Sequence, residues 1–235
     1  MIMIMEVATG GELYDYVKKM EKLPEITARK IIYQVIDGIS YCHERRIVHK
    51  DLKLENVLFK TTPDEDNLDI SIIDFGIAGV VIGGVGEAVD AGSLPYMAPE
   101  VLSGADTETT FALDVWAIGI MFYTMLYGKL PFYHAKESNL KDQIINGALK
   151  FDPKVPVSDE AKQLITGMLD KDPAKRFRLI AIMDMDYYKM EDAQIEKLVA
   201  ETEAVHEQKK AEKQAALEAK NEMNQKLGHL GISVQ

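Results

Sequence analysis

The chain has 235 residues, of which 47% are apolar and 28% are charged. This composition excludes a mainly disordered chain and is sufficient for one sizeable hydrophobic core. Acidic residues outnumber basic ones by 38 to 27, which gives a formal charge of −11. Because nucleic-acid backbones are negative, we expect no nucleic-acid binding and favour basic partners or basic peptide substrates.

The cellular environment is indicated by what the sequence lacks. Cys42 is the only cysteine, which excludes an intrachain disulfide and suits a reducing compartment. No secretory signal is visible, no apolar run is long enough to cross a membrane, and the five histidines lack the spacing of a zinc site. We therefore expect a soluble, cytoplasmic protein that does not bind membranes.

The first elements are predicted from hydrophobic periodicity. The segment from Met1 to Met5 is apolar at every position, which predicts a strand buried on both faces. After the break at Gly10 and Gly11, residues 12–20 predict a short helix. A longer helix starts at Pro24, because the following apolar residues recur at steps of three and four: Ala28, Ile31, Ile32, Val35, Ile36, Ile39 and Cys42.

The middle of the chain predicts loops and short strands. Residues 49–56 predict a loop, and residues 57–60 and 70–73 predict strands separated by an acidic turn at 61–67. The segment 77–92 contains five glycines, which make regular structure costly, and it predicts a loop.

The last part of the chain is predicted to be helical. We expect helices at about 112–127, 136–146, 158–169 and 174–187, the first being the most apolar and so the most buried. Beyond Tyr188 the sequence is rich in Ala, Glu, Lys and Gln, which are strong helix formers, and apolar positions are sparse. This composition predicts a long solvated helix.

Four motifs occur in a fixed order. His49-Lys50-Asp51-Leu52-Lys53-Leu54-Glu55-Asn56 has the pattern H-x-D-L-x-x-x-N, and it is followed by Asp74-Phe75-Gly76, Ala98-Pro99-Glu100 and Asp114-x-Trp116-x-x-Gly119. The ordered set resembles a eukaryotic serine/threonine protein kinase. The resemblance implies a mainly α fold: a protein-kinase-like large (C-terminal) lobe with a residual small-lobe strand and a long C-terminal helix.

The resemblance also implies a division of the chain. Residues 1–8 would be a residual small-lobe strand and hinge, residues 9–188 the kinase C-lobe, and residues 189–235 a charged helical tail. Residues 9–13, Thr-Gly-Gly-Glu-Leu, resemble the calcium/calmodulin-dependent and AMP-activated branches of the family.

Roles for the catalytic residues follow from the same resemblance. Asp51 would accept or orient the proton of the attacking hydroxyl, Lys53 would neutralise charge on the transferred phosphoryl group, and Ser93 would help to seat the substrate. Asn56 and Asp74 would hold Mg²⁺ through hard oxygen ligands. A lysine two residues after the base resembles serine/threonine kinases, not tyrosine kinases.

Nucleotide and substrate contacts are implied in a similar way. The Glu6 carbonyl and the Ala8 amide would contact the adenine of ATP, and Leu58 would form the floor of its pocket. Glu12 would favour a basic residue near the target Ser or Thr. An equally weighted alternative is that Glu12 only places a negative charge at a helix N-terminus.

Other matches imply structural roles. Glu100 and Arg176 resemble a pair that ties the segment after the activation loop to the helical core. Asp114 would anchor the backbone of the catalytic loop, and His49 would pack beneath Phe75. His43 is given no chemical role.

Two kinase elements do not precede the hinge in this sequence: a Gly-rich loop and a V-A-I-K-type lysine. We therefore expect phosphoryl transfer by this chain alone to be weak or absent. The alternative is a pseudokinase scaffold that binds a protein assembly. In either case we expect a protein partner that covers the segment from Met1 to Met5 or binds the C-terminal helix.

Regulation is expected to depart from the family pattern. Lys50 stands where the family has an arginine that binds a phosphorylated activation loop, and residues 77–92 contain no Ser, Thr or Tyr. These two features predict that phosphorylation of this loop does not switch the protein.

Overall fold

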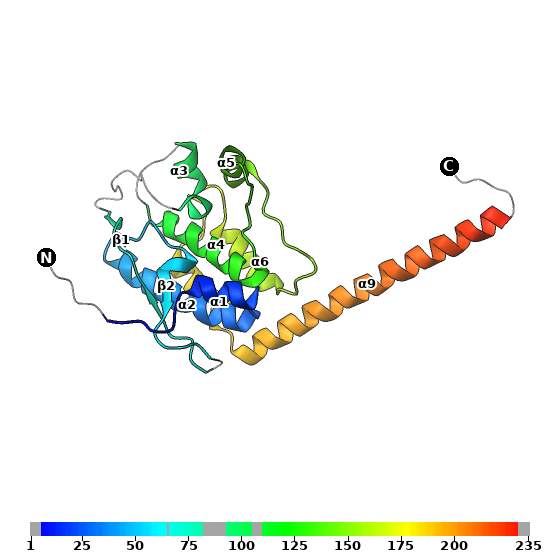
Figure 1. Cartoon of the computed structure of the whole chain (residues 1–235), viewed down its shortest axis with the longest axis horizontal. Coiled ribbons are helices and arrows are strands. Elements are labelled where there is room, and N and C mark those ends of the chain that lie inside the picture. The colour runs from blue at the N-terminus through cyan, green and yellow to red at the C-terminus, as the bar shows by residue number, and fades with distance from the viewer. Residues whose placement is uncertain (1–5, 65, 82–92, 105–109, 230–235) are drawn as a thin grey trace.

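The computed structural model describes residues 6–64, 66–81, 93–104 and 110–229, with side chains through Glu212 and at Gln214 and Glu218. These residues form a mainly helical body, from which one long helix, α9, projects (Figure 1). Within the described ranges, no helix combines the length and the apolar character that a bilayer crossing requires.

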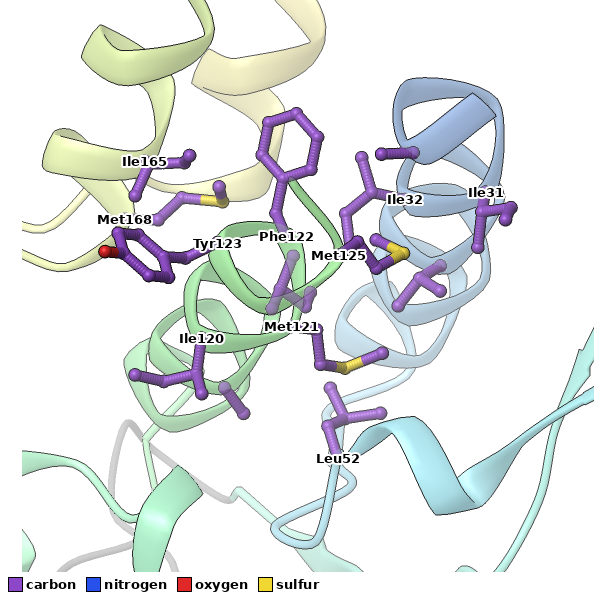
Figure 2. Packing of buried hydrophobic residues seen from close by; sticks show 14 of the residues in the cluster. Ile31, Ile32, Leu52, Ile120, Met121, Phe122, Tyr123, Met125, Ile165 and Met168 are labelled. Carbon is purple, nitrogen blue, oxygen red and sulfur yellow. The ribbon is translucent and has the colours of Figure 1, made fainter. Parts of the chain in front are cut away.

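Helix α4 (Ala112–Tyr127) lies at the centre of the body. Its residues from Leu113 to Tyr127 are all buried, as the apolar sequence predicts. Helices α2 (Glu25–Glu44) and α6 (Asp159–Met168) pack on opposite sides of it (Figure 2). Since a fully buried Ile, Leu or Met contributes about 1.5–3 kcal/mol, this three-helix packing supplies much of the stability of the body.

Two short antiparallel sheets flank this core. Strands β2 (Val57–Phe59) and β3 (Ile70–Ile72) pair with Leu58 opposite Ser71, which confirms both predicted strands. Strands β1 (Ile47–Val48) and β4 (Gly79–Val80) form the second sheet. The prediction of a loop over 77–92 is wrong at β4, because these two residues find hydrogen-bonding partners on a strand thirty residues earlier.

Most predicted helices are confirmed within one or two residues. They are α1 (Leu13–Met20), α2, α4, α5 (Glu137–Asn146) and α6. Ser158 caps α6, since its hydroxyl accepts a hydrogen bond from the Ala161 amide at 3.1 Å. The sequence analysis did not predict the short helix α3 (Pro99–Ser103) or the 3₁₀ turns η1 (Leu54–Asn56) and η2 (Leu94–Tyr96).

The predicted helix over 174–187 is wrong. The chain instead forms α7 (Leu179–Asp184) and α8 (Asp186–Lys189), with extended backbone at Arg178 and at Met185. Tertiary contacts explain the late start, because Arg176 is buried and its guanidinium donates to the Asp170 carbonyl at 3.0 Å and to Glu100. Helical propensity alone could not indicate these partners.

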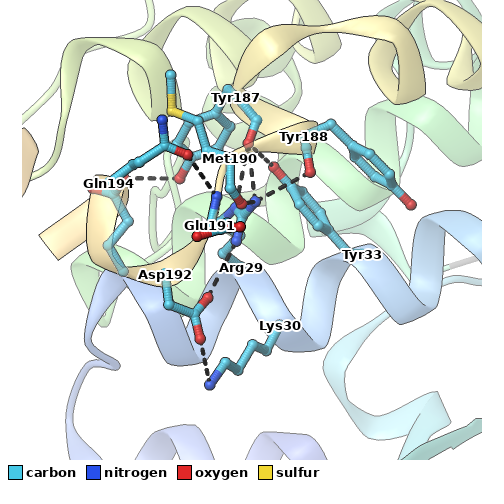
Figure 3. A network of polar contacts seen from close by, with 10 residues as sticks. Arg29, Lys30, Tyr33, Tyr187, Tyr188, Met190, Glu191, Asp192 and Gln194 are labelled. Atoms are coloured by element: carbon cyan, nitrogen blue, oxygen red, sulfur yellow. Dashed lines mark hydrogen bonds and ion pairs between the residues drawn. The ribbon is translucent and has the colours of Figure 1, made fainter.

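The junction between α8 and α9 (Asp192–His229) is held by Arg29 of α2 (Figure 3). This nearly buried guanidinium donates to the carbonyl oxygens of Tyr187 at 3.2 Å, Tyr188 at 3.1 Å and Met190, and it pairs with Asp192 at 3.4 Å. These carbonyls are the unpaired groups at the end of a helix, so the arginine stabilises the break between the two helices. The predicted long helix is confirmed, but it begins at Asp192.

Two predictions lie outside the described residues. They are the strand over residues 1–5 and the loop character of residues 82–92.

Candidate active site

Asp114, from the first turn of α4, holds the backbone of the catalytic loop. Its carboxylate accepts hydrogen bonds from the amides of His49 and Lys50, both at 2.9 Å, and it is 1% exposed. Lys50 has a φ of 70°, a left-handed conformation that these bonds help to hold. The predicted anchoring role of Asp114 is confirmed.

His43 is a further contact of Asp114 that the sequence analysis missed. Its Nε2 lies 2.8 Å from Asp114 Oδ2. His43 occupies the last turn of α2 and Asp114 the first turn of α4, so the pair joins the two helices that support the loop. A histidine in the last turn of a helix does not by itself indicate this contact.

The predicted catalytic side chains converge on one hydrogen-bonded cluster. Lys53 Nζ lies 2.7 Å from Asp51 Oδ2, and the Ser93 hydroxyl donates to Asp51 Oδ1 at 3.1 Å. Lys53 Nζ also donates to Ser93 Oγ at 3.0 Å. The Asn56 amide donates to the Asp51 carbonyl oxygen at 2.8 Å. Residues separated by forty positions are thus brought together around one carboxylate.

The electrostatics of this cluster keep Asp51 ionised. Burial, the largest single effect, favours the neutral acid, but it is outweighed by the Lys53 ammonium and by hydrogen bonds from Ser93, so the pKa of Asp51 is lowered. An ionised carboxylate can accept a hydrogen bond, and then the proton, from a hydroxyl placed beside it.

A cleft of about 970 Å³ contains the residues predicted to contact the nucleotide. Its walls include Glu6, Ala8 and Leu58, together with Asp74 and its neighbours. The hinge is held against β2 because the Gly10 amide donates to the Phe59 carbonyl at 3.0 Å. A Cβ at Gly10 would lie 2.0 Å from the Thr61 carbonyl oxygen, so this close approach requires glycine.

Asn56 and Asp74 offer the donor chemistry of a magnesium site. The Asn56 amide nitrogen is committed to Asp51, which leaves its oxygen for a cation. Asp74 is exposed to the cleft, and its Oδ1 accepts only the Gly76 amide at 3.3 Å among the described residues. Carboxylate and amide oxygens are ligands that Mg²⁺ prefers, so the residues present fit this ion.

The backbone around Asp74 is tied to the catalytic loop. The Ile73 amide donates to the Asn56 carbonyl at 2.9 Å, and His49 Nε2 lies 2.9 Å from the Ile73 carbonyl oxygen. The rings of His49 and Phe75 lie 4.5 Å apart, which confirms the predicted packing. No described contact joins the Asp74 and Asn56 side chains directly.

Acidic groups lie on the side of the site near α1. Glu12 precedes α1 with an exposed side chain that makes no capping hydrogen bond, and its backbone bridges Leu58. Glu55, which the sequence analysis missed, has a buried Oε2 without a hydrogen-bond partner in the described structure. Burial and, next, the charge of Glu55 raise the pKa of Tyr96, so the two side chains are close. Only the position of Glu55 within the catalytic-loop motif could have indicated from the sequence that it lies at the site.

The predicted pair of Glu100 and Arg176 is confirmed. Two parallel hydrogen bonds of 2.7 and 2.8 Å join the guanidinium to the carboxylate, and both residues are buried. Arg176 also donates to the Ala112 carbonyl at 3.0 Å. The pair therefore ties α3 to the start of α4 and keeps the segment that follows Ser93 in place.

Comparison with known proteins identifies the family. The family model described as "Protein kinase domain" matches residues 1–188. Over 193 residues the chain is 38% identical to the carbon catabolite-derepressing protein kinase of Candida tropicalis, covering 81% of this chain and 29% of that protein. It is 37% identical over 194 residues to the CBL-interacting serine/threonine-protein kinase 1 of Arabidopsis thaliana, covering 80% and 41% of the two chains.

A human relative agrees with these matches. The chain is 36% identical over 178 residues to the SNF-related serine/threonine-protein kinase of Homo sapiens, covering 75% of this chain and 22% of that protein. The chain spans less than half the length of each of these three relatives. With the catalytic-loop geometry and these matches together, the chain belongs to the protein kinase family, among the serine/threonine kinases.

Proposed function

We propose that this chain contributes the catalytic loop of an enzyme that transfers the γ-phosphoryl group of Mg·ATP to Ser or Thr hydroxyls of proteins. The cluster of Asp51, Lys53, Ser93 and Asn56 is the observation that carries the proposal. Lys53, Asn56 and Ser93 all bind the Asp51 carboxylate, and phosphoryl transfer depends on such positioning of polar groups.

In this proposal the cleft binds the nucleotide. The Glu6 carbonyl and the Ala8 amide contact adenine, and Leu58 forms the floor of the pocket. Asn56 and Asp74 hold Mg²⁺, which would neutralise charge on the phosphates. The support is that Glu6, Ala8, Leu58 and Asp74 line the same cleft.

In the proposed transfer of the phosphoryl group, each polar group of the cluster has one role. The substrate oxygen forms a bond to the γ-phosphorus while the bond to the β–γ bridging oxygen breaks and ADP leaves. Asp51, which its lowered pKa keeps ionised, orients the hydroxyl through a hydrogen bond and takes its proton as the bond to phosphorus forms. Lys53 places positive charge beside the transferred group, and Ser93 helps to seat the substrate hydroxyl.

The substrate is proposed to carry a basic residue near its target Ser or Thr. The exposed carboxylate of Glu12, the unpartnered oxygen of Glu55 and the net charge of −11 support this preference. Since ATP and a free cysteine are typical of the cell interior, the cytoplasm is the proposed site of action. The relatives are serine/threonine kinases, so they do not favour the pseudokinase scaffold. A partner on residues 1–5 or on the C-terminal helix stays a prediction.

Transfer of labelled γ-phosphate from ATP to a basic Ser/Thr peptide tests the proposal. The rate for this chain alone is expected to be low, and replacing Asp51 with Asn should lower it further, by up to about 10³-fold, since a positioned base contributes about 10²–10⁴-fold. The matched control is Asp66→Asn, at an exposed position of the turn between β2 and β3, which should leave the rate unchanged. Equal rates for the wild type and Asp51→Asn would contradict catalysis by this chain.

A further inference from the structure

The hairpin of β2 and β3 connects the two residues that offer oxygen ligands to Mg²⁺. Asn56 directly precedes β2, and Asp74 is the second residue after β3. Each strand has only three residues, and a two-stranded ribbon of this size is marginally stable by itself. The positions of Asn56 and Asp74 relative to each other therefore depend on the contacts that hold the outer edges of the hairpin.

The outer edge of β2 is held by the backbone of residues 10–12. The Phe59 amide donates to the Gly11 carbonyl at 3.0 Å, and the Gly10 amide donates to the Phe59 carbonyl at 3.0 Å. Glu12 forms a further backbone bridge with Leu58. This edge is thus paired as it would be in a sheet.

The outer edge of β3 is held by a side chain instead. Among the strands that the structure describes, only β2 pairs with β3. The Asp69 carbonyl faces β2 and accepts a hydrogen bond from the Lys60 amide at 2.9 Å. Since backbone groups alternate along a strand, those of Leu68 and Ile70 face the outer edge. There Gln34 Nε2 donates to the Leu68 carbonyl at 3.0 Å, and Gln34 Oε1 accepts from the Ile70 amide at 3.2 Å.

The carboxamide of Gln34 thus supplies the donor and the acceptor that a neighbouring strand would supply. Its Nε2 also donates to the Lys30 carbonyl, one turn earlier in α2, at 3.2 Å. A reversed amide would place its oxygen against two carbonyl oxygens and its N–H groups against the Ile70 amide, so only one orientation fits. Because α2 packs on the central helix α4, Gln34 ties β3 to the rigid part of the body.

The other end of β3 leads directly to Asp74. The intervening residue, Ile73, donates from its amide to the Asn56 carbonyl at 2.9 Å, and its carbonyl oxygen lies 2.9 Å from His49 Nε2. A shift of β3 along β2 would break the bond to Asn56 and would move Asp74 within the cleft. Gln34 holds the start of the same strand and therefore opposes such a shift.

We propose that Gln34 is a positioning residue for Asp74, which it places through the register of β3 on β2. Gln34 is not among the residues that line the nucleotide cleft, so it acts on the ion only through the strand. The effect on Mg²⁺ rests on the proposed function of Asp74, whereas the hold on β3 is measurable without any ligand.

Hydrogen exchange of the whole chain without ligand tests the hold on the strand. Gln34→Met preserves the length of the side chain and suits a helix, but it removes all three hydrogen bonds. We expect the Ile73 amide, three residues from the nearest contact, to exchange about fivefold to tenfold faster. The Phe177 amide, bonded to the Gly167 carbonyl at 3.0 Å, should be unchanged. Faster exchange at Ile70 alone, or equally at Ile73 and Phe177, would overturn the proposal.

The affinity for ADP with and without Mg²⁺, measured by isothermal titration calorimetry, tests the effect on the ion. In the wild type, Mg²⁺ should tighten ADP binding, and the ratio of the two affinities is the magnesium gain. Gln34→Met should reduce this gain about threefold to tenfold and leave the affinity in EDTA unchanged. A general structural role would lower both affinities together, and an unchanged gain would overturn the proposal.

A double-variant cycle separates this inference from the proposed function. Added to Asp74→Asn, Gln34→Met should change the magnesium gain little further, because both act through the same ligand. Additive losses would overturn the role of Gln34 alone. If Asp74→Asn by itself leaves the gain unchanged, the proposed magnesium site is wrong.

Two further variants complete the test. Gln34→Glu keeps the acceptor for the Ile70 amide but places a carboxylate oxygen against the two carbonyls, so it should produce the same defects. It replaces Gln34→Met should that variant fail to fold. The matched control is Gln143→Met on α5, where the lost contact is with the Tyr133 amide at 3.2 Å. This control should alter neither measurement, and defects equal to those of Gln34→Met would contradict the proposal.

Discussion

The catalytic loop and helix α9 are stabilised in opposite ways. The loop, residues 49–56, has little regular structure, and its shape depends on partners far away in the sequence, such as Asp114 and Ser93. Helix α9 is regular, and beyond its base its side-chain pairs are local and exposed, as between Lys210 and Glu207. The positions of the functional groups therefore depend on buried polar contacts between distant segments. Helical propensity, in contrast, is sufficient to form α9.

The energies of the two kinds of contact differ widely. Removing one partner of a buried ion pair costs about 3–5 kcal/mol, because the other charge is left without compensation. An exposed pair on a helix contributes about 0.3–0.5 kcal/mol, since water screens it and the side chains lose entropy. Substitutions in the body should therefore matter far more than those in α9.

The largest effect on stability is expected from Arg176→Ala. It leaves the Glu100 carboxylate buried without its two hydrogen bonds, so the free energy of unfolding should fall by about 3–5 kcal/mol in urea titrations. The matched control is Arg178→Ala, at an exposed position two residues later, which should change it by less than about 0.5 kcal/mol. Equal losses for both variants would contradict the importance of the buried pair.

A smaller loss is expected from Gly10→Ala at the hinge. The added methyl group would meet the Thr61 carbonyl oxygen, and the backbone shift should cost about 1–3 kcal/mol. Gly38→Ala, inside α2, is the same substitution where the nearest atom is a flexible Ile72 methyl group at 3.1 Å. It should be neutral or stabilising by up to about 1 kcal/mol. Thermal unfolding followed by circular dichroism distinguishes the two.

The electrostatic balance at the catalytic carboxylate is tested by Lys53→Met. Without the ammonium, the hydrogen bond and the charge of Lys53 are lost while burial stays, so the pKa of Asp51 should rise from its lowered value. Carboxyl ¹³C NMR titration measures this directly. Lys60→Met, on the wall of the nucleotide cleft, is the control. An unchanged pKa in Lys53→Met would show that Lys53 does not control the ionisation of Asp51.

This pKa shift also predicts a pH dependence of stability. Because the folded pKa of Asp51 is lowered, its ionised form contributes stability that is complete above the unfolded pKa and is lost as the pH falls through the folded value. In Lys53→Met, where the folded pKa should lie closer to the unfolded one, this contribution to stability should be smaller.

The smallest effect is expected in α9. Lys197→Ala removes an exposed contact with Glu201 of 3.8 Å and should lower the free energy of unfolding by less than about 0.5 kcal/mol. Urea titration at low and high salt measures it, and the difference between variant and wild type should shrink as salt rises. A loss above about 1 kcal/mol would show that α9 is tied to the body beyond its base.

Much of the candidate site was predictable, because its residues are close together in sequence. Asp51, Lys53 and Asn56 lie within six positions, so one motif identified three of the converging groups. Ser93, assigned by family resemblance, is now seen to hydrogen-bond to Asp51. Glu55 and His43 were missed, because their significance depends on burial and on a partner far away in the sequence.

The sequence by itself determined the helices with a strong apolar stripe, the two strands beside the acidic turn and the helical nature of α9. These features depend on interactions between residues a few positions apart, which periodicity and propensity report. Only the tertiary structure decided where 174–187 breaks, since Arg29 and Arg176 bind carbonyl groups and carboxylates distant in sequence. It also decided that β4 pairs with β1, because a two-residue strand is stable only when another segment supplies its hydrogen bonds.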